Sequence, residues 1–125
     1  MTQSVLIETA PPEAPGLQKM YGLIELDQEG TVLYTRFEGD GAASFSARDF
    51  TGLNFYTQVA PFRNVSEFRQ RLDDFSRGTS AAYSMDFTCD YADGPLHVRV
   101  LLARIRERSR QDVTKSILVH FRRAR

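Results

Sequence analysis

The 125-residue sequence lacks tryptophan, long apolar runs and any excess of charge of one sign. No stretch approaches the roughly 18 consecutive apolar residues that a membrane-spanning helix needs, so no membrane span is expected. Lysine plus arginine and aspartate plus glutamate number 16 each, which leaves no net charge. Capture of nucleic acid or of a membrane surface by overall charge is therefore not expected. The chain also begins without the basic and apolar segments of a signal peptide, so none is expected.

Cysteine is nearly absent, because Cys89 is the sole example. One cysteine forms neither an intramolecular disulfide nor a paired-cysteine metal site. The two histidines, His97 and His120, are expected on strands, opposite to the apolar side chains, and do not complete a tetrahedral zinc site with Cys89. The sequence therefore predicts no metal and no cofactor. A reducing, cytoplasmic location is the simplest interpretation of such cysteine usage.

The length suits one compact domain, and a hydrophobic content of 42% is enough for a real core. Residues 1–15 are predicted to form a loosely held arm, since prolines at 11, 12 and 15 prevent regular helix or sheet. Residues 16–125 are predicted to form the single domain. The arm, with Leu17 and Met20, is expected to pack on the sheet or on a second copy of the chain.

Apolar periodicity predicts five strands and one long helix. The pattern places a turn with Gly30 between the first two strands and a hairpin turn at Asp93-Gly94. An α+β fold follows, with one five-stranded antiparallel sheet carrying its helices on one face. The predicted strands are 23–27, 31–37, 83–91, 96–102 and 115–122, the long helix is 65–77, and short helices are expected at 46–50 and 55–59.

The long helix carries its own end signals. Asn64 is predicted to be the N-cap residue, and Glu67 stands where it completes a capping box. Gly78 is predicted to end the helix in the left-handed conformation.

This order of elements is that of a PAS domain, and several segments resemble the photoactive yellow protein family. The stretch Asn54-Phe55-Tyr56-x-x-Val-Ala-Pro is the most specific, since a generic PAS domain does not need it. The resemblance covers about residues 20–122. It is carried by residues 22–30, Glu38-Gly39-Asp40, 52–62, 66–68 and 87–91.

The sequence departs from this family at the residues that hold its chromophore. Phe62 follows Val-Ala-Pro, where the family has the cysteine that carries p-coumaric acid as a thioester. Tyr34 or Thr35 lies near the slot of the family's tyrosine, and residues 42–46, where the family's pocket arginine falls, contain none. Flavin-type PAS domains place their reactive cysteine where this chain has Phe55. Covalent light sensing by either route is therefore not expected.

The resemblance implies a ligand pocket inside the sheet. Its candidate residues are Tyr34, Thr35, Glu38, Phe45, Phe55, Phe62 and Cys89. Glu38 is either a buried acid that controls the charge of a ligand or a solvated loop residue. Phe62 either fills the chromophore space as core or lines a smaller apolar cavity for a noncovalent ligand.

The expected function is a non-enzymatic PAS sensory module that acts through a small ligand or through protein contacts. No nucleophile motif or phosphate-binding loop is present. The expected partners are a separate signalling protein, a small apolar ligand and a second copy in a homodimer, with no nucleic acid and no membrane. Arginines crowd the last quarter of the chain, either as a docking patch for an acidic partner or as soluble strand and loop positions. The alternatives are a small enzyme of the ketosteroid-isomerase-like type and a purely structural PAS adaptor.

Overall fold

The computed structural model describes residues 19–39 and 49–124. The predicted arm over residues 1–15 lies outside the described residues, as do residues 46–48 of one expected short helix, whose last two residues, Asp49 and Phe50, are not helical. None of the helices in the described ranges is long and apolar enough to cross a membrane. The elements are β2 (Gly22–Leu26), β3 (Val32–Phe37), the short π-type helix η2 (Phe55–Val59), α2 (Val65–Arg77), β4 (Ala82–Tyr91), β5 (Gly94–Arg106) and β6 (Thr114–Arg123).

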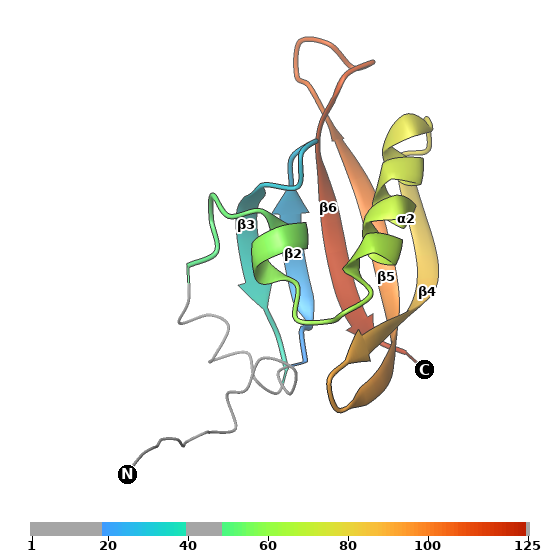
Figure 1. The fold of residues 1–125 in the computed structure, drawn as a ribbon. Coiled ribbons are helices and arrows are strands. Elements are labelled where there is room, and N and C mark those ends of the chain that lie inside the picture. The colour runs from blue at the N-terminus through green and yellow to red at the C-terminus, as the bar shows by residue number, and fades with distance from the viewer. Residues whose placement is uncertain (1–18, 40–48, 125) are drawn as a thin grey trace.

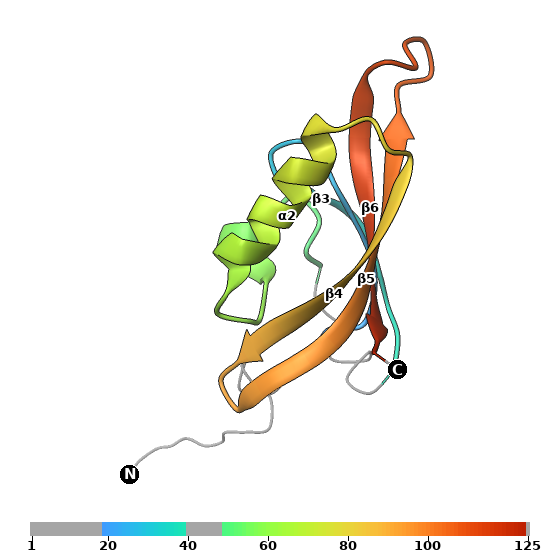
Figure 2. The ribbon, with the colours of Figure 1, turned by 90° about the vertical axis from the view of Figure 1, so that its right-hand side faces the viewer.

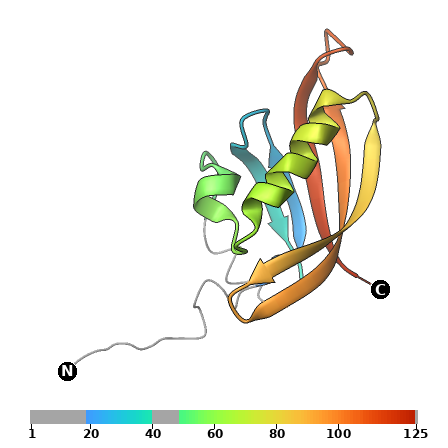
Figure 3. The same cartoon turned by 45° about the vertical axis from the view of Figure 1, so that its right-hand side comes forward.

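The strands form one five-stranded sheet in the order β3-β2-β6-β5-β4, and every neighbouring pair is antiparallel. Figure 1 shows η2 in front of β2 and β3 and α2 on the β5–β4 side of the sheet, and Figure 3 shows α2 running obliquely across the strands. The view from the side in Figure 2 places both helices on the same face. The predicted α+β architecture, one five-stranded antiparallel sheet with its helices on one face, is thereby confirmed.

The two predicted hairpin turns form for identifiable reasons. Gly30 adopts a φ of 91°, which favours glycine, and Asp27 accepts hydrogen bonds from the amides of Glu29 and Thr31. In the β4–β5 hairpin Tyr91 pairs with Gly94, so the two turn residues lie one position earlier than the Asp93-Gly94 signal. Gly94 flanks the turn with a φ of 130°.

The predicted bounds of α2, Val65–Arg77, are confirmed, but its ends differ from expectation. The Asn64 side chain caps no helical amide; it donates to the carbonyl of Thr88 and accepts from the amide of Asp90, thus tying the start of the helix to β4. The prediction for Gly78 is wrong, because its φ of −86° is not left-handed. The chain leaves the helix with Gly78 in extended form, and residues 79–81 connect it to β4.

The core lies between the helices and the face of the sheet that they cover. On β4 the alternation predicted from the sequence buries Met85, Phe87, Cys89 and Tyr91 toward the helices. The helix contributes Phe68, Leu72 and Phe75 from one face, as its three- and four-residue spacing requires. The hydroxyl of Tyr91 accepts a hydrogen bond from the amide of Met20. This bond ties the chain just before β2 to the edge strand β4.

Candidate functional site

The sheet separates the residues that were expected to form one pocket. Phe55, Phe62 and Cys89 are buried on the helix side. Thr35 pairs with Ile24 on that side and is half-buried, whereas Tyr34 pairs with Glu25 on the opposite face and is 48% exposed. Phe45 lies outside the described residues. The described members of the set therefore divide between two faces of the sheet.

Phe62 is packed into an aromatic cluster on the helix side. Its side chain is only 4% exposed. Its ring centroid lies within 5.7 to 6.4 Å of five others, mostly in edge-to-face arrangement, which is favourable for aromatic rings. These neighbours are Phe55, Phe68, Phe87, Tyr91 and Phe121.

Cys89 is 1% exposed and lies on β4 between Phe87 and Tyr91 on the buried face. Burial disfavours the thiolate and raises the pKa of this thiol to about 12. Cys89 is therefore a small apolar side chain of the core and not a poised nucleophile.

This environment predicts slow chemistry at Cys89. At about pH 8 a thiol with a pKa near 12 is ionised roughly a thousandfold less than an ordinary cysteine, so labelling by a thiol reagent is expected to be slower by at least that factor. Ellman's reagent with the native protein measures the rate, and the same protein in guanidinium is the control. Labelling of the native protein at the unfolded rate would contradict this assignment.

Glu38 lies just beyond β3, with its side chain 53% exposed. Its carboxylate is 3.7 Å from the Nε2 atom of His120, and its amide donates to the carbonyl of Tyr21. The Nε2 atom of His120 is itself buried and has no hydrogen-bond partner among the described residues. The two side chains thus meet at the border of the outer face and not beside the aromatic cluster. Asp40, which the sequence pairs with Glu38, lies outside the described residues.

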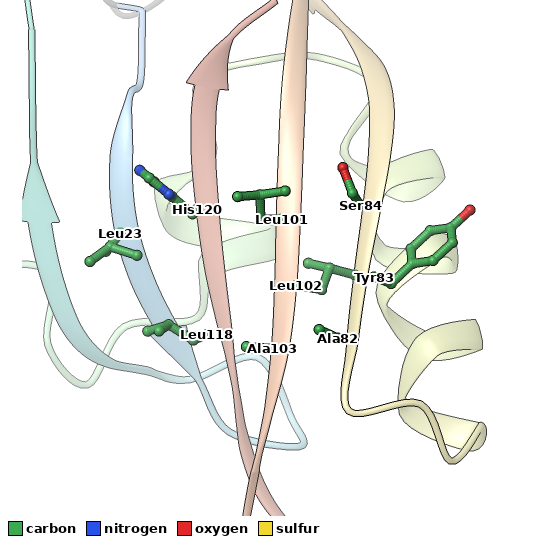
Figure 4. A pocket seen from close by; sticks show the side chains of 9 residues that line it. All are labelled: Leu23, Ala82, Tyr83, Ser84, Leu101, Leu102, Ala103, Leu118 and His120. Atoms are coloured by element: carbon green, nitrogen blue, oxygen red, sulfur yellow. The ribbon is translucent and has the colours of Figure 1, made fainter.

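The outer face, which no described helix covers, carries an apolar hollow of about 500 Å³. Register explains its composition, because Leu23, His120 and Leu101 form one row across the strands, with Leu118 and Ala103 in the next row. Figure 4 shows these side chains side by side, and two small residues, Ala82 and Ala103, leave the depression between the leucines.

Charged residues border this hollow in two places. Glu25 and Arg36 lie toward β3, next to the leucine rows. Past one end of the hollow, along β4 and β5, Asp86 and Arg99 form a cross-strand ion pair, with Oδ1 and Nε 2.8 Å apart. The outer face therefore combines an apolar centre with flanks that carry both signs of charge.

The arginines of the last quarter do not gather on one face. Arg104 is buried on the helix side, Arg99 pairs with Asp86 on the outer face, and Arg110 pairs with Asp112 in the β5–β6 loop. This distribution fits the interpretation as strand and loop positions better than a single docking patch.

Sequence reasoning missed the outer hollow. Leu101 and Ala103 stand at β5 positions that alternation assigns to solvent, and Leu23 and Leu118 do so on β2 and β6. Apolar residues at both alternating sets of strand positions are typical of sheets that are covered on both faces. That signal was available in the sequence.

Comparison with known proteins gives this geometry a family. Over 85 residues the chain is 31% identical to photoactive yellow protein from Rhodothalassium salexigens, a match that covers 67% of each chain. The chain belongs to the photoactive yellow protein family. No family model matches the sequence.

Solved structures agree with this family at the level of fold. The photoactive yellow protein domain of the sensor histidine kinase Ppr from Rhodospirillum centenum gives a TM-score of 0.54 at 24% identity, covering 82% of this chain and 85% of that one. The PAS domain of Bordetella pertussis BvgS gives 0.58 at 12% identity, covering 90% and 79%. The fold is thus the PAS fold and not the ketosteroid-isomerase-like alternative.

The residues present do not fit the covalent chromophore that the name photoactive yellow protein implies. The resemblance aligns Phe62 with the family's cysteine, and a benzyl side chain cannot form a thioester. The ring of Phe62 instead occupies the centre of the aromatic cluster. Cys89 points into the same core from β4, with a pKa raised to about 12. Neither side chain is a thioester donor at neutral pH.

Proposed function

We propose that this member of the photoactive yellow protein family is a non-enzymatic sensory module that signals through protein contacts and carries no covalent p-coumarate. The observation that carries the proposal is the apolar hollow on the outer face of the sheet. Apolar surface of this kind, bordered by charge, is typical of protein-binding sites. The Ppr domain with the same fold comes from a sensor histidine kinase, which supports a role in signal transduction.

We further propose that the occupant of the outer face is an amphipathic helix of a separate signalling protein. The small side chains of Ala82 and Ala103 leave a depression between leucines, into which a row of larger apolar side chains fits. Arg36 and Glu25 beside the hollow and the Asp86–Arg99 pair past one end of it are complementary to a helix with charges of both signs next to its apolar stripe.

Two broader expectations belong to the same proposal. We expect the domain to be cytoplasmic, because a reducing compartment suits a single cysteine that is kept as a buried free thiol. It also acts as a homodimer, as PAS sensory domains commonly do. A purely structural adaptor would use the same outer face without sensing a ligand.

Two experiments test the outer face: photo-crosslinking and the substitution Leu101→Asp. A photo-crosslinking residue at Leu118, which lines the hollow, is expected to give a discrete cross-linked product in the source cells. The same residue at Gln70, exposed on α2, is the matched control and is expected to give none. The partner is identified by mass spectrometry, purified and titrated by calorimetry. Leu101→Asp is expected to raise its Kd by at least about tenfold, since it buries a charge in an apolar contact.

Two results would refute this docking surface. One is the absence of a product from position 118. The other is a purified partner whose Kd is unaffected by Leu101→Asp, with circular dichroism showing that the variant keeps its fold.

A small apolar ligand is the second candidate, because the volume of the hollow, about 500 Å³, lies within the range of ligand pockets. Native mass spectrometry of freshly purified protein separates the two. A retained molecule that Leu101→Asp expels supports the ligand, and the mass of the bare chain supports the protein partner alone.

A further inference from the structure

The outer edge of β4 pairs with no strand among the described residues. Its outward backbone groups are hydrogen-bonded at one end and have no partner at the other. Tyr91 and Gly94 flank the hairpin turn, so the odd-numbered residues of β4 exchange hydrogen bonds with β5 and the even-numbered ones face outward. Three contacts agree with this alternation: the carbonyl of Thr88 and both backbone groups of Asp90 are bound by the side chain of Asn64 or the amide of Arg63.

The outward amides and carbonyls of Ala82, Ser84 and Asp86 have no partner among the described residues. This stretch of β4 contains no proline and no bulge, which are two devices that usually protect an edge. The Asp86 side chain does not block the edge either, because it lies on the outer face against Arg99. The edge is therefore a ready template for another strand.

A hollow of about 260 Å³ lies beside the open edge, on its helix side. Arg71, Asp74 and Phe75 of α2 form one wall, and Tyr83 of β4 forms another. Tyr83 is 53% exposed, unusually high for a large aromatic side chain on the helix-facing side of a strand. An added strand would place alternate side chains against this hollow.

We propose that β4 pairs with β4 of a second copy of this chain, antiparallel, about a two-fold axis at Ser84. This inference rests on the homodimer proposed above and names its interface. Ser84 then lies opposite Ser84 of the second copy, and Ala82 lies opposite Asp86. All six open backbone groups of each chain are satisfied, and the two five-stranded sheets become one.

Side chains favour this register over one centred on Asp86. Tyr83 lies opposite Met85 of the second copy, so its exposed ring meets a thioether that already contacts Arg71, with Nη1 and Sδ 3.6 Å apart. A shift that centred the axis on Asp86 would set two carboxylates directly opposite each other. It would also require the carbonyl of Thr88, which Asn64 already occupies.

Ser84→Pro tests the interface, with Ser84→Ala as its matched control. Proline removes the outward amide of Ser84 and leaves the ladder to β5 intact, whereas alanine keeps that amide. Sedimentation over a wide range of protein concentration is expected to show a wild-type dimer, an unchanged Kd in Ser84→Ala and a Kd raised by at least about tenfold in Ser84→Pro. Leu23→Asp, on the outer face of β2 and separated from β4 by β6 and β5, is expected to leave the dimer unchanged.

The outcomes separate the interface from the homodimer itself. A wild-type chain that is monomeric throughout overturns both. A dimer that survives Ser84→Pro, or that Leu23→Asp disrupts, overturns the β4 interface and keeps the homodimer.

Hydrogen exchange of the wild-type protein needs no variant and decides the case if Ser84→Pro fails to fold. The amides of Ser84 and Asp86 are expected to be protected in concentrated and exposed in dilute protein. The amide of Met85, which pairs with Val100 inside the sheet, is protected in both. Equal exposure of Ser84 and Asp86 at both concentrations, in a protein that sediments as a dimer, would overturn the inference.

Discussion

Replacement of Phe62 by cysteine is expected to lower the free energy of unfolding by about 3 kcal/mol and to give no working photocycle. The loss of stability follows from the cavity that the missing ring leaves among five aromatic neighbours. The family has a pocket arginine that supports the chromophore. Residues 42–46, where that arginine falls, contain none, so photochemistry is not expected. Urea denaturation measures the first effect. Incubation with activated p-coumaric acid, followed by illumination and absorbance spectroscopy, measures the second.

Phe62→Leu is the control for the packing effect. It keeps most of the apolar volume, so its cost is expected to be about half as large. Full bleaching and recovery in Phe62→Cys would show that the aromatic cluster accommodates the chromophore after all. An unchanged free energy of unfolding would show that the Phe62 ring is not part of the tightly packed core.

Arg104→Met is expected to lower the free energy of unfolding by about 3 kcal/mol. Arg104 extends from β5 into the space behind the end of α2 and is 9% exposed. Its guanidinium donates to the carbonyls of Phe75, Ser76 and Ser80, and to the hydroxyl of Thr114. Methionine keeps the aliphatic stem but removes the donor to the carbonyls of Ser76 and Ser80, whereas the Phe75 carbonyl keeps the amide of Gly78. Chemical denaturation by urea, followed by circular dichroism, provides the measurement.

Arg99→Met is the matched control on the same strand. Its ion pair with Asp86 is exposed, so the expected change is within about 1 kcal/mol. Equal effects at the two positions would mean that the guanidinium of Arg104 does no more than an exposed ion pair.

Much of the fold follows from local patterns that tertiary contacts reinforce. The spacing of Phe68, Leu72 and Phe75 gave the bounds of α2, because the same residues that mark one helical face are those buried against the sheet. Strict alternation on β4 likewise gave the buried face of the edge strand. The bounds of β5 were predicted too short, since its first and last residues are held by pairing with β4 and β6 and not by alternation.

Features that depend on partners distant in the sequence were not predictable. Asn64 was read as a helix cap, yet its side chain binds β4, and only the packing of α2 against that strand brings the two together. Arg104 finds acceptors at the end of α2, which lies at least 27 residues earlier in the sequence. The separation of Tyr34 from Phe62 depends on which face of β3 Tyr34 occupies, and a bulge between Glu25 and Leu26 displaces the pairing there. The position of Glu38 depends on how the chain leaves β3.

The ring cluster around Phe62 bears on the strength of the proposed signalling. A sensory module that carries no covalent pigment, as we propose for this domain, stores no photon energy and works at equilibrium. It can shift a partner between two conformations only by the difference in its binding free energy for them, and each factor of ten in population needs about 1.4 kcal/mol of that difference. The strength of its output is therefore limited by the contacts that its surface can make.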